Sequence, residues 1–209
     1  MAEVKPRCRL YLQLPAKPSA KLEAQLAEAL ASADAVCVLL RRGETPADEG
    51  WASRLIDLVQ SRGVAVLVAD DPELAERLGS DGIHLSVADT LRYAKARELL
   101  GASASIGVGC GLSRHDAMRV AEMGADYVAF GSPESSIDAV NQIADLTAWW
   151  AEIFVVPCVA WNIDRVDDAE RLAKLGADFV APSARLWQEA GVAGLAEMAS
   201  VIGQVRRAA

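Results

Sequence analysis

The sequence predicts a single domain over residues 1–209 that folds as a (β/α)8 or TIM barrel, and two observations carry that prediction. A small residue, an aspartate and a short apolar run recur four times, with the aspartates at positions 34, 81, 126 and 178. The last three copies follow a glycine that closes an amphipathic segment, which is typical of a helix end before a buried strand. Successive aspartates are 47, 45 and 52 residues apart, and one strand–helix unit takes about 25 to 30 residues. The four copies are therefore expected to be alternate strands of eight.

The expected strands are short, apolar and bounded by turn residues. Residues 9–14 alternate and end at Pro15, whereas residues 35–40 are apolar throughout, as in a strand that is buried on both faces. The strands are expected at residues 9–14, 35–40, 64–68, 82–85, 105–108, 127–130, 154–160 and 178–181.

The helices between the strands are predicted from apolar residues at helical spacing and from capping residues. Leu22, Leu26 and Leu30 share one face of the first helix. Asp71 and Pro72 are typical of an N-cap and a first helical position. The helices are expected at residues 18–32, 46–61, Pro72 to Gly79, 88–100, Ser113 to Gly124, a segment containing Trp149–Trp150, 165–175 and 189–206.

Composition narrows the class of protein. The chain is 52% hydrophobic, and no apolar run reaches the roughly 18 residues of a membrane span. No basic segment followed by an apolar one marks a signal peptide, and the four cysteines lack metal-type spacing, so we expect reduced thiols in a cytoplasmic protein. The net charge of −8 argues against nucleic acid or an anionic membrane as the main partner.

In this fold the chemistry lies where strands run into the following helices. Arg41 and Arg42 end a strand there and are the best candidates to bind an anion, although either side chain could instead be solvated or pair with Glu44. Asp70 and Asp89 could hold one Mg²⁺ through carboxylate oxygens. The structural alternative is that residues 86–89 form a capping box, which would give Asp89 a role at a helix start.

Three further features have both a functional and a structural interpretation. His84 could be a catalytic acid or base, or a histidine that is hydrogen-bonded inside the barrel. Ser183 precedes a short predicted helix whose N-terminal amides could bind a phosphate. Trp149 and Trp150 cannot share one helix face, so one of them could meet the partner subunit of a homodimer, or both could pack within the chain.

Six motifs, in this order, resemble the thiamine-phosphate synthase family and its thiazole-tautomerase relatives across nearly the whole chain. The motifs are Val66 to Asp70 with Leu74 and Ala75, Gly79 to Leu85 with Asp89, Ile106 to Val108, Gly124 to Gly131, Val156 to Ala160, and Gly176 to Ala181. The resemblance implies that hydroxymethylpyrimidine diphosphate is joined to a thiazole phosphate with release of pyrophosphate. It also implies Mg²⁺ as cofactor, a phosphorylated ligand, and catalytic roles for Arg41 and Asp70.

The polar groups of the family pattern are mostly replaced. Its Gln-x-Arg-x-Lys run corresponds to Leu39, Arg41 and Gly43, and its Asn-Asp-Arg run to residues 69–71, where the arginine becomes an aspartate. Its Thr-x-Thr-Lys loop becomes residues 135–139, without a lysine. The glycine pair that would cradle phosphate becomes Trp161–Asn162, and Ser132 stands where the tautomerase relatives have a histidine.

These replacements leave three functions open. The first is a synthase of the family type with weakened catalysis, in which Arg42, Ser132, Asn162 and Ser183 contact the substrate. The second is a non-catalytic relative that binds a phosphorylated or heterocyclic small molecule. The third is an isomerase or lyase of phosphate-bearing substrates that uses His84 as acid or base.

Overall fold

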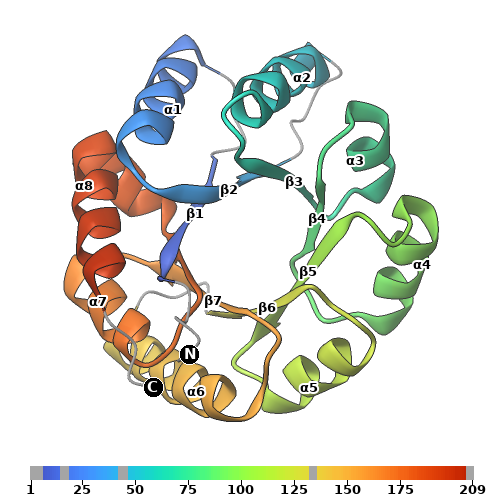
Figure 1. The fold of residues 1–209 in the computed structure, drawn as a ribbon. Helices are drawn as coiled ribbons and strands as arrows, with labels where there is room; N and C mark the ends of the chain where they lie inside the picture. The colour runs from blue at the N-terminus through green and yellow to red at the C-terminus, as the bar shows by residue number, and fades with distance from the viewer. Residues whose placement is uncertain (1–6, 15–18, 42–46, 132–135, 206–209) are drawn as a thin grey trace, which may run out of the picture.

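Eight parallel strands close into one barrel in chain order, and a helix follows each strand and lies outside it (Figure 1). This computed structural model describes residues 7–14, 19–41, 47–131 and 136–205. The strands are β1 (Arg9–Gln13), β2 (Ala35–Leu40), β3 (Ala65–Ala69), β4 (Gly82–Leu85), β5 (Ser105–Gly111), β6 (Tyr127–Gly131), β7 (Cys158–Ile163) and β8 (Phe179–Pro182). The helices are α1 (Ala20–Ser32), α2 (Ala47–Gln60), α3 (Pro72–Leu78), α4 (Thr90–Leu100), α5 (Arg114–Glu122), α6 (Ile137–Ile153), α7 (Val166–Lys174) and α8 (Ala184–Gln204). The predicted barrel is confirmed.

The recurring aspartates precede the even-numbered strands, as predicted, and three of them brace the neighbouring strand. The carboxylate of Asp81 accepts a hydrogen bond from the amide of Val66 at 2.7 Å. Asp126 and Asp178 do the same for the amides of Ile106 in β5 and Cys158 in β7, at 2.7 and 2.8 Å. All three contacts lie where strands begin, at the end of the barrel opposite the expected site. The motif that revealed the fold therefore has a structural role.

The core has two layers. One lies between the strands and the surrounding helices, and it includes Trp150 and Phe130. The other fills the barrel interior with inward-pointing side chains of alternate strand residues: Tyr11, Cys37, Leu39, Leu67, Tyr127, Ala129, Val159 and Ala181. All four cysteines are buried and reduced, as expected. Among the described residues, no helix combines the length and the apolar character that crossing a membrane requires.

Strand boundaries were predicted wrongly at β5 and β7. β5 continues to Gly111 rather than ending at residue 108, and β7 ends at Ile163 rather than at residue 160. The seventh strand begins at Cys158 rather than at residue 154. The ring of Phe154 stacks on Trp150 at 4.0 Å and 15°, and the indole nitrogen of Trp150 donates to the carbonyl of Val156 at 2.7 Å. Since Val155 is 99% exposed, this apolar segment is a surface turn held by Trp150.

The last helix also differs from its prediction. α8 begins at Ala184 and is interrupted at Gly191, whose φ of 59° is not helical. The short helix expected directly after β8 is therefore present, and it continues past a kink into the long helix expected from residue 189.

Candidate active site at the barrel mouth

His84 lies at one end of a buried chain of hydrogen bonds inside the barrel. Its Nδ1 is 2.9 Å from the hydroxyl of Tyr127, which is 2.8 Å from the hydroxyl of Tyr11. The imidazole also stacks on the Tyr127 ring, with 5.8 Å between centroids. The interior position that was one of the two interpretations of His84 is therefore confirmed, while a catalytic role stays a prediction.

The surroundings of His84 keep its imidazole neutral. Burial lowers the pKa of His84 to about 4, the negative charge of Asp70 opposes this change, and the positive charge of Arg41 adds to it. The charges of Arg41 and Asp70 thus both act on His84 at the carboxyl ends of β2, β3 and β4, which is the end of the barrel that we call the mouth. Arg41 and Asp70, two of the residues expected to be catalytic, therefore both lie within electrostatic range of the third, His84.

Trp161 covers His84 from the mouth side of the barrel. The indole stacks on the imidazole with centroids 4.5 Å apart and planes 10° apart, and it lies 5.2 Å from the Tyr11 ring. β7 is irregular directly after this residue, where Asn162 has a φ of 66°, and such a bulge changes the direction of nearby side chains. Gly131 leaves room for the indole, because a Cβ there would lie 2.5 Å from the Cβ of Trp161. Trp161 is half-buried, so part of its side chain remains accessible.

Asp70 is held in place by residues of the next strand–helix unit. Its φ of 57° is unusual for a residue with a side chain. Its carboxylate accepts from the amide and the hydroxyl of Ser86 at 2.9 and 2.6 Å. The guanidinium of Arg92 lies 3.4 Å from the same carboxylate and donates to the Asp70 carbonyl at 3.1 Å. These contacts offset the backbone strain and fix the carboxylate.

Asp89 caps the start of α4. One carboxylate oxygen accepts from the amides of Leu91 and Arg92 at 2.9 and 3.1 Å. The expected capping box is wrong in detail, because Asp89 itself is the N-cap and the Ser86 hydroxyl turns to Asp70 instead. The structural role expected for Asp89 is confirmed.

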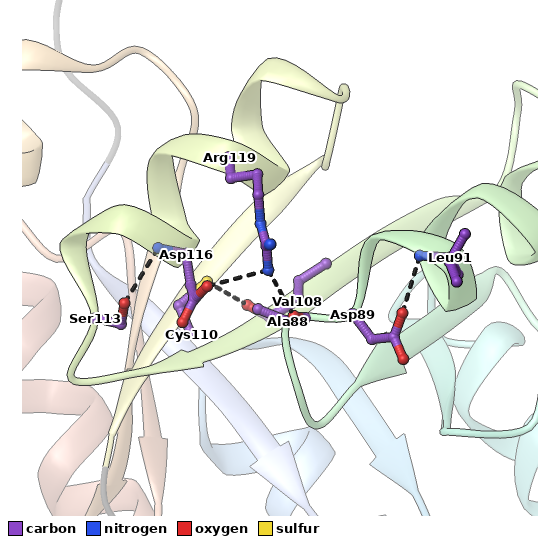
Figure 2. Close-up of polar contacts among 8 residues, drawn as sticks. All are labelled: Ala88, Asp89, Leu91, Val108, Cys110, Ser113, Asp116 and Arg119. Atoms are coloured by element: carbon purple, nitrogen blue, oxygen red, sulfur yellow. Dashed lines mark hydrogen bonds and ion pairs between the residues drawn. The ribbon is translucent and has the colours of Figure 1, made fainter.

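Arg119 fixes the loop that carries Asp89. Figure 2 shows its guanidinium reaching from α5 to Asp116 and to the carbonyl of Ala88, each at 3.1 Å. Cys110 lies beside this cluster, and its thiol donates to the carbonyl of Val108. Burial raises the pKa of Cys110 to about 12, so the thiol is unreactive at neutral pH.

The carboxylates of the described residues do not form a ready magnesium site. Both oxygens of Asp70 accept hydrogen bonds from Ser86, and the positive guanidinium of Arg92 lies against them. One oxygen of Asp89 is taken by two helix amides. No cluster of three or more histidine, cysteine, aspartate or glutamate side chains within the described ranges could hold a metal ion. A divalent ion at Asp70 would lie close to the positive guanidinium of Arg92, which disfavours its binding.

The predicted phosphate subsite after β8 contains a carboxylate. The hydroxyl of Ser183 caps α8 by accepting from the amide of Leu186 at 3.2 Å, and it also bonds to Asp164. Asp164 in turn lies 3.9 Å from the guanidinium of Arg185. Because a carboxylate repels an anionic ligand, this helix start is a poorer phosphate site than the sequence indicated.

The remaining residues that the sequence singled out are Arg42, Ser132, Trp149 and Trp150. Arg42 and Ser132 lie outside the described residues. Trp150 is buried against the barrel, whereas Trp149 is covered by the guanidinium of Arg114 at 4.7 Å. The packing of both rings is therefore explained within the chain, and the homodimer stays a prediction.

The sequence analysis missed three residues that surround His84 and Asp70. Tyr11 and Tyr127 point into the barrel interior, and the two-residue period of β1 and β6 could have placed them beside His84. Arg92 stands three residues after Asp89 in the first turn of α4, where a long side chain can reach back to the strand ends. Its contact with Asp70 joins segments 22 residues apart, and no local pattern in the sequence indicates it.

The fold and the mouth together define a class: a (β/α)8 barrel with its polar groups gathered at the carboxyl ends of the strands. Residues 10–186 match a family model described as thiamine monophosphate synthase. A thiamine-phosphate synthase from Rhodospirillum centenum is 42% identical over 192 residues, covering 86% of this chain and 89% of that protein. Another from Erythrobacter litoralis is 37% identical over 209 residues, covering 94% and 98%. The chain belongs to the thiamine monophosphate synthase family.

Solved structures agree on the fold. The thiamine phosphate pyrophosphorylase from Pyrococcus furiosus superimposes with a TM-score of 0.75 at 23% identity, covering 93% of this chain and 95% of that one. The wild-type GGGPS from Thermoplasma volcanium gives 0.70 at 16% identity, covering 97% and 95%. At these identities the similarity concerns the barrel alone.

Proposed function

We propose that this chain binds the heterocyclic precursors of thiamine phosphate at the barrel mouth and joins them far more slowly than its relatives do. Membership of the family supports the choice of ligand. The observation that carries the proposal is the half-buried indole of Trp161 above a neutral His84, at the position where the family resemblance expects a phosphate-binding glycine pair.

The indole of Trp161 suits the aromatic ring of a heterocycle better than its phosphate group. The indole has one face on His84 and part of its surface uncovered, so a planar ring can stack on it from the mouth. A stacking contact of this kind is worth about 1–3 kcal/mol for a nucleobase. The mouth can therefore recognise a pyrimidine or thiazole without the glycine pair.

Slow coupling follows from the positive groups that the mouth lacks. The leaving diphosphate needs cations to stabilise its charge, and one charge-assisted contact contributes about 1.5–3 kcal/mol, or roughly ten- to a hundredfold in rate. Residue 71 is an aspartate where the resemblance expects an arginine, and residue 43 is a glycine where it expects a lysine. Magnesium is the cofactor that the family resemblance implies, and it would supply further positive charge to the leaving diphosphate.

A coupling assay tests this proposal. The purified chain is mixed with hydroxymethylpyrimidine diphosphate, thiazole phosphate and Mg²⁺, and both pyrophosphate and thiamine phosphate are measured. Because the two charge-assisted contacts expected at residues 43 and 71 are missing, we expect a rate at least about a hundredfold below that of the Rhodospirillum centenum relative. A rate equal to that of the relative would contradict the proposal.

A binding protein without turnover is the second candidate, and the carboxylate of Asp164 at the expected phosphate subsite favours it. This candidate predicts that the precursors raise the melting temperature while no product forms above a heat-inactivated control. Measurable coupling would exclude it, and a flat melting screen across the precursors would count against both candidates.

A further inference from the structure

Arg92 presents an unused part of its guanidinium at the mouth. Its side chain is 44% exposed, and a single nitrogen, Nη2, makes both contacts to Asp70. A guanidinium has five N–H donors in a rigid fork that matches phosphate oxygens. The donors of Nη1 and Nε make no hydrogen bond to any residue that the structure describes, so one edge of the fork is oriented by Asp70 and the other is open.

The position of Arg92 is fixed from both ends. Its backbone amide donates to the carboxylate of Asp89 in the first turn of α4, and its side chain reaches the carboxylate and the carbonyl of Asp70. Asp70 is itself held by two hydrogen bonds from Ser86. A guanidinium that is already ordered loses less conformational entropy when it binds a ligand.

Arg92 and Arg41 bring two positive charges to the same side of the mouth. The charge of Arg41 acts on His84, as does the charge of Asp70, against which Arg92 lies. Asp70 offsets one of the two arginine charges, and the carboxylates of Asp71 and Asp89 cap helix starts at the same rim. The positive groups that a phosphoryl group meets between β2 and β4 are therefore the guanidinium of Arg41 and the oriented donor fork of Arg92.

We propose that Arg92 binds the phosphoryl group of the ligand and that this binding requires no divalent cation. The family resemblance expects an arginine at residue 71, at the end of β3, where this chain has an aspartate. Arg92 places a guanidinium next to that position. The inference rests on the proposed function for the identity of the ligand, but the anion site itself can be tested without the heterocycle.

The test measures the binding of inorganic pyrophosphate by titration calorimetry in EDTA and again with Mg²⁺. We expect the unchanged chain to bind pyrophosphate in EDTA and Arg92→Gln to bind at least about tenfold more weakly. Arg92→Lys keeps the charge without the fork, so an intermediate affinity is expected. Arg62→Gln is the matched control, because Arg62 is also an exposed arginine that donates to a backbone carbonyl, that of Ala27 at 2.7 Å, and lies before β3 at the opposite end of the barrel. Its affinity should equal that of the unchanged chain.

Three results would overturn the inference: unchanged affinity in Arg92→Gln, an equal loss in Arg62→Gln, or binding that vanishes in EDTA. If Arg92→Gln does not fold by circular dichroism, Arg92→Lys decides, and full affinity in that variant contradicts the role of the fork. The proposed function and this inference can be contradicted independently of each other. Pyrophosphate binding through Arg92 without any response to the heterocycles would contradict only the proposed function, whereas coupling with normal pyrophosphate binding in Arg92→Gln would contradict only this inference.

Discussion

Replacing Gly107 by alanine is expected to destabilise the chain by about 3 kcal/mol, because the interior of the barrel has no room for a methyl group at this position. A Cβ on Gly107 would lie 1.8 Å from the Tyr127 ring. Tyr127 cannot move aside freely, since its hydroxyl bonds to both Tyr11 and His84. The free energy of unfolding in urea measures the loss.

A second substitution tests whether the loss of stability comes from this clash with the Tyr127 ring or from a general intolerance of β5 to substitution. The double variant, Gly107→Ala with Tyr127→Leu, replaces the ring by a smaller side chain. It should lose less stability than the sum of the losses in the two single variants. Gly203→Ala serves as the control, because nothing lies within 4 Å of a Cβ at that helical position, and we expect unchanged or slightly raised stability there. Additive losses in the double variant would show that the Tyr127 ring is not what excludes the methyl group.

Acid is expected to destabilise the chain through His84. The pKa of His84 is about 4 in the folded chain and about 6.5 when unfolded, so between these values the unfolded state binds more protons. The contribution of His84 is fully present above pH 6.5 and is lost as the pH falls to about 4, where the loss reaches about 3 kcal/mol. Urea unfolding measured from pH 4 to pH 8 gives the slope.

His84→Gln isolates this contribution, because glutamine can keep a hydrogen bond to Tyr127 but has no titrating group. The variant should be less stable at pH 8 and should lose less stability between pH 6.5 and 4 than the unchanged chain. His115→Gln is the control, since His115 is exposed on α5, and its pH profile should match that of the unchanged chain. Parallel profiles for His84→Gln and the unchanged chain would contradict the neutral, buried imidazole.

The fold was predictable from the sequence because its signals are local and repeat. A helix end and an aspartate-led apolar run recur at each even strand, with a glycine between them at the last three, and the structure shows that Asp81, Asp126 and Asp178 repeat the same contact. The wrong start of β7 has a local cause too. An apolar segment predicts burial but not its partner, and Phe154 packs on a helix end instead of pairing in the sheet.

The site was only partly predictable because its contacts join distant segments. Strand ends indicated Arg41, Asp70 and His84, and their grouping follows from the closed barrel. The guanidinium of Arg92 on Asp70 and the indole of Trp161 on His84 depend on side-chain directions. The direction of the indole in turn depends on a bulge at Asn162, which only the coordinates reveal.

Titration of thiazole phosphate, followed by calorimetry, tests most directly whether the heterocycle binds on Trp161. The unchanged chain is compared with Trp161→Leu, in which an apolar side chain still covers His84. We predict saturable binding to the unchanged chain and an affinity at least about fivefold weaker in Trp161→Leu, as expected when a stacking contact is lost. The same affinity in both proteins, or no binding to the unchanged chain, would contradict the claim that the heterocycle binds on the indole of Trp161.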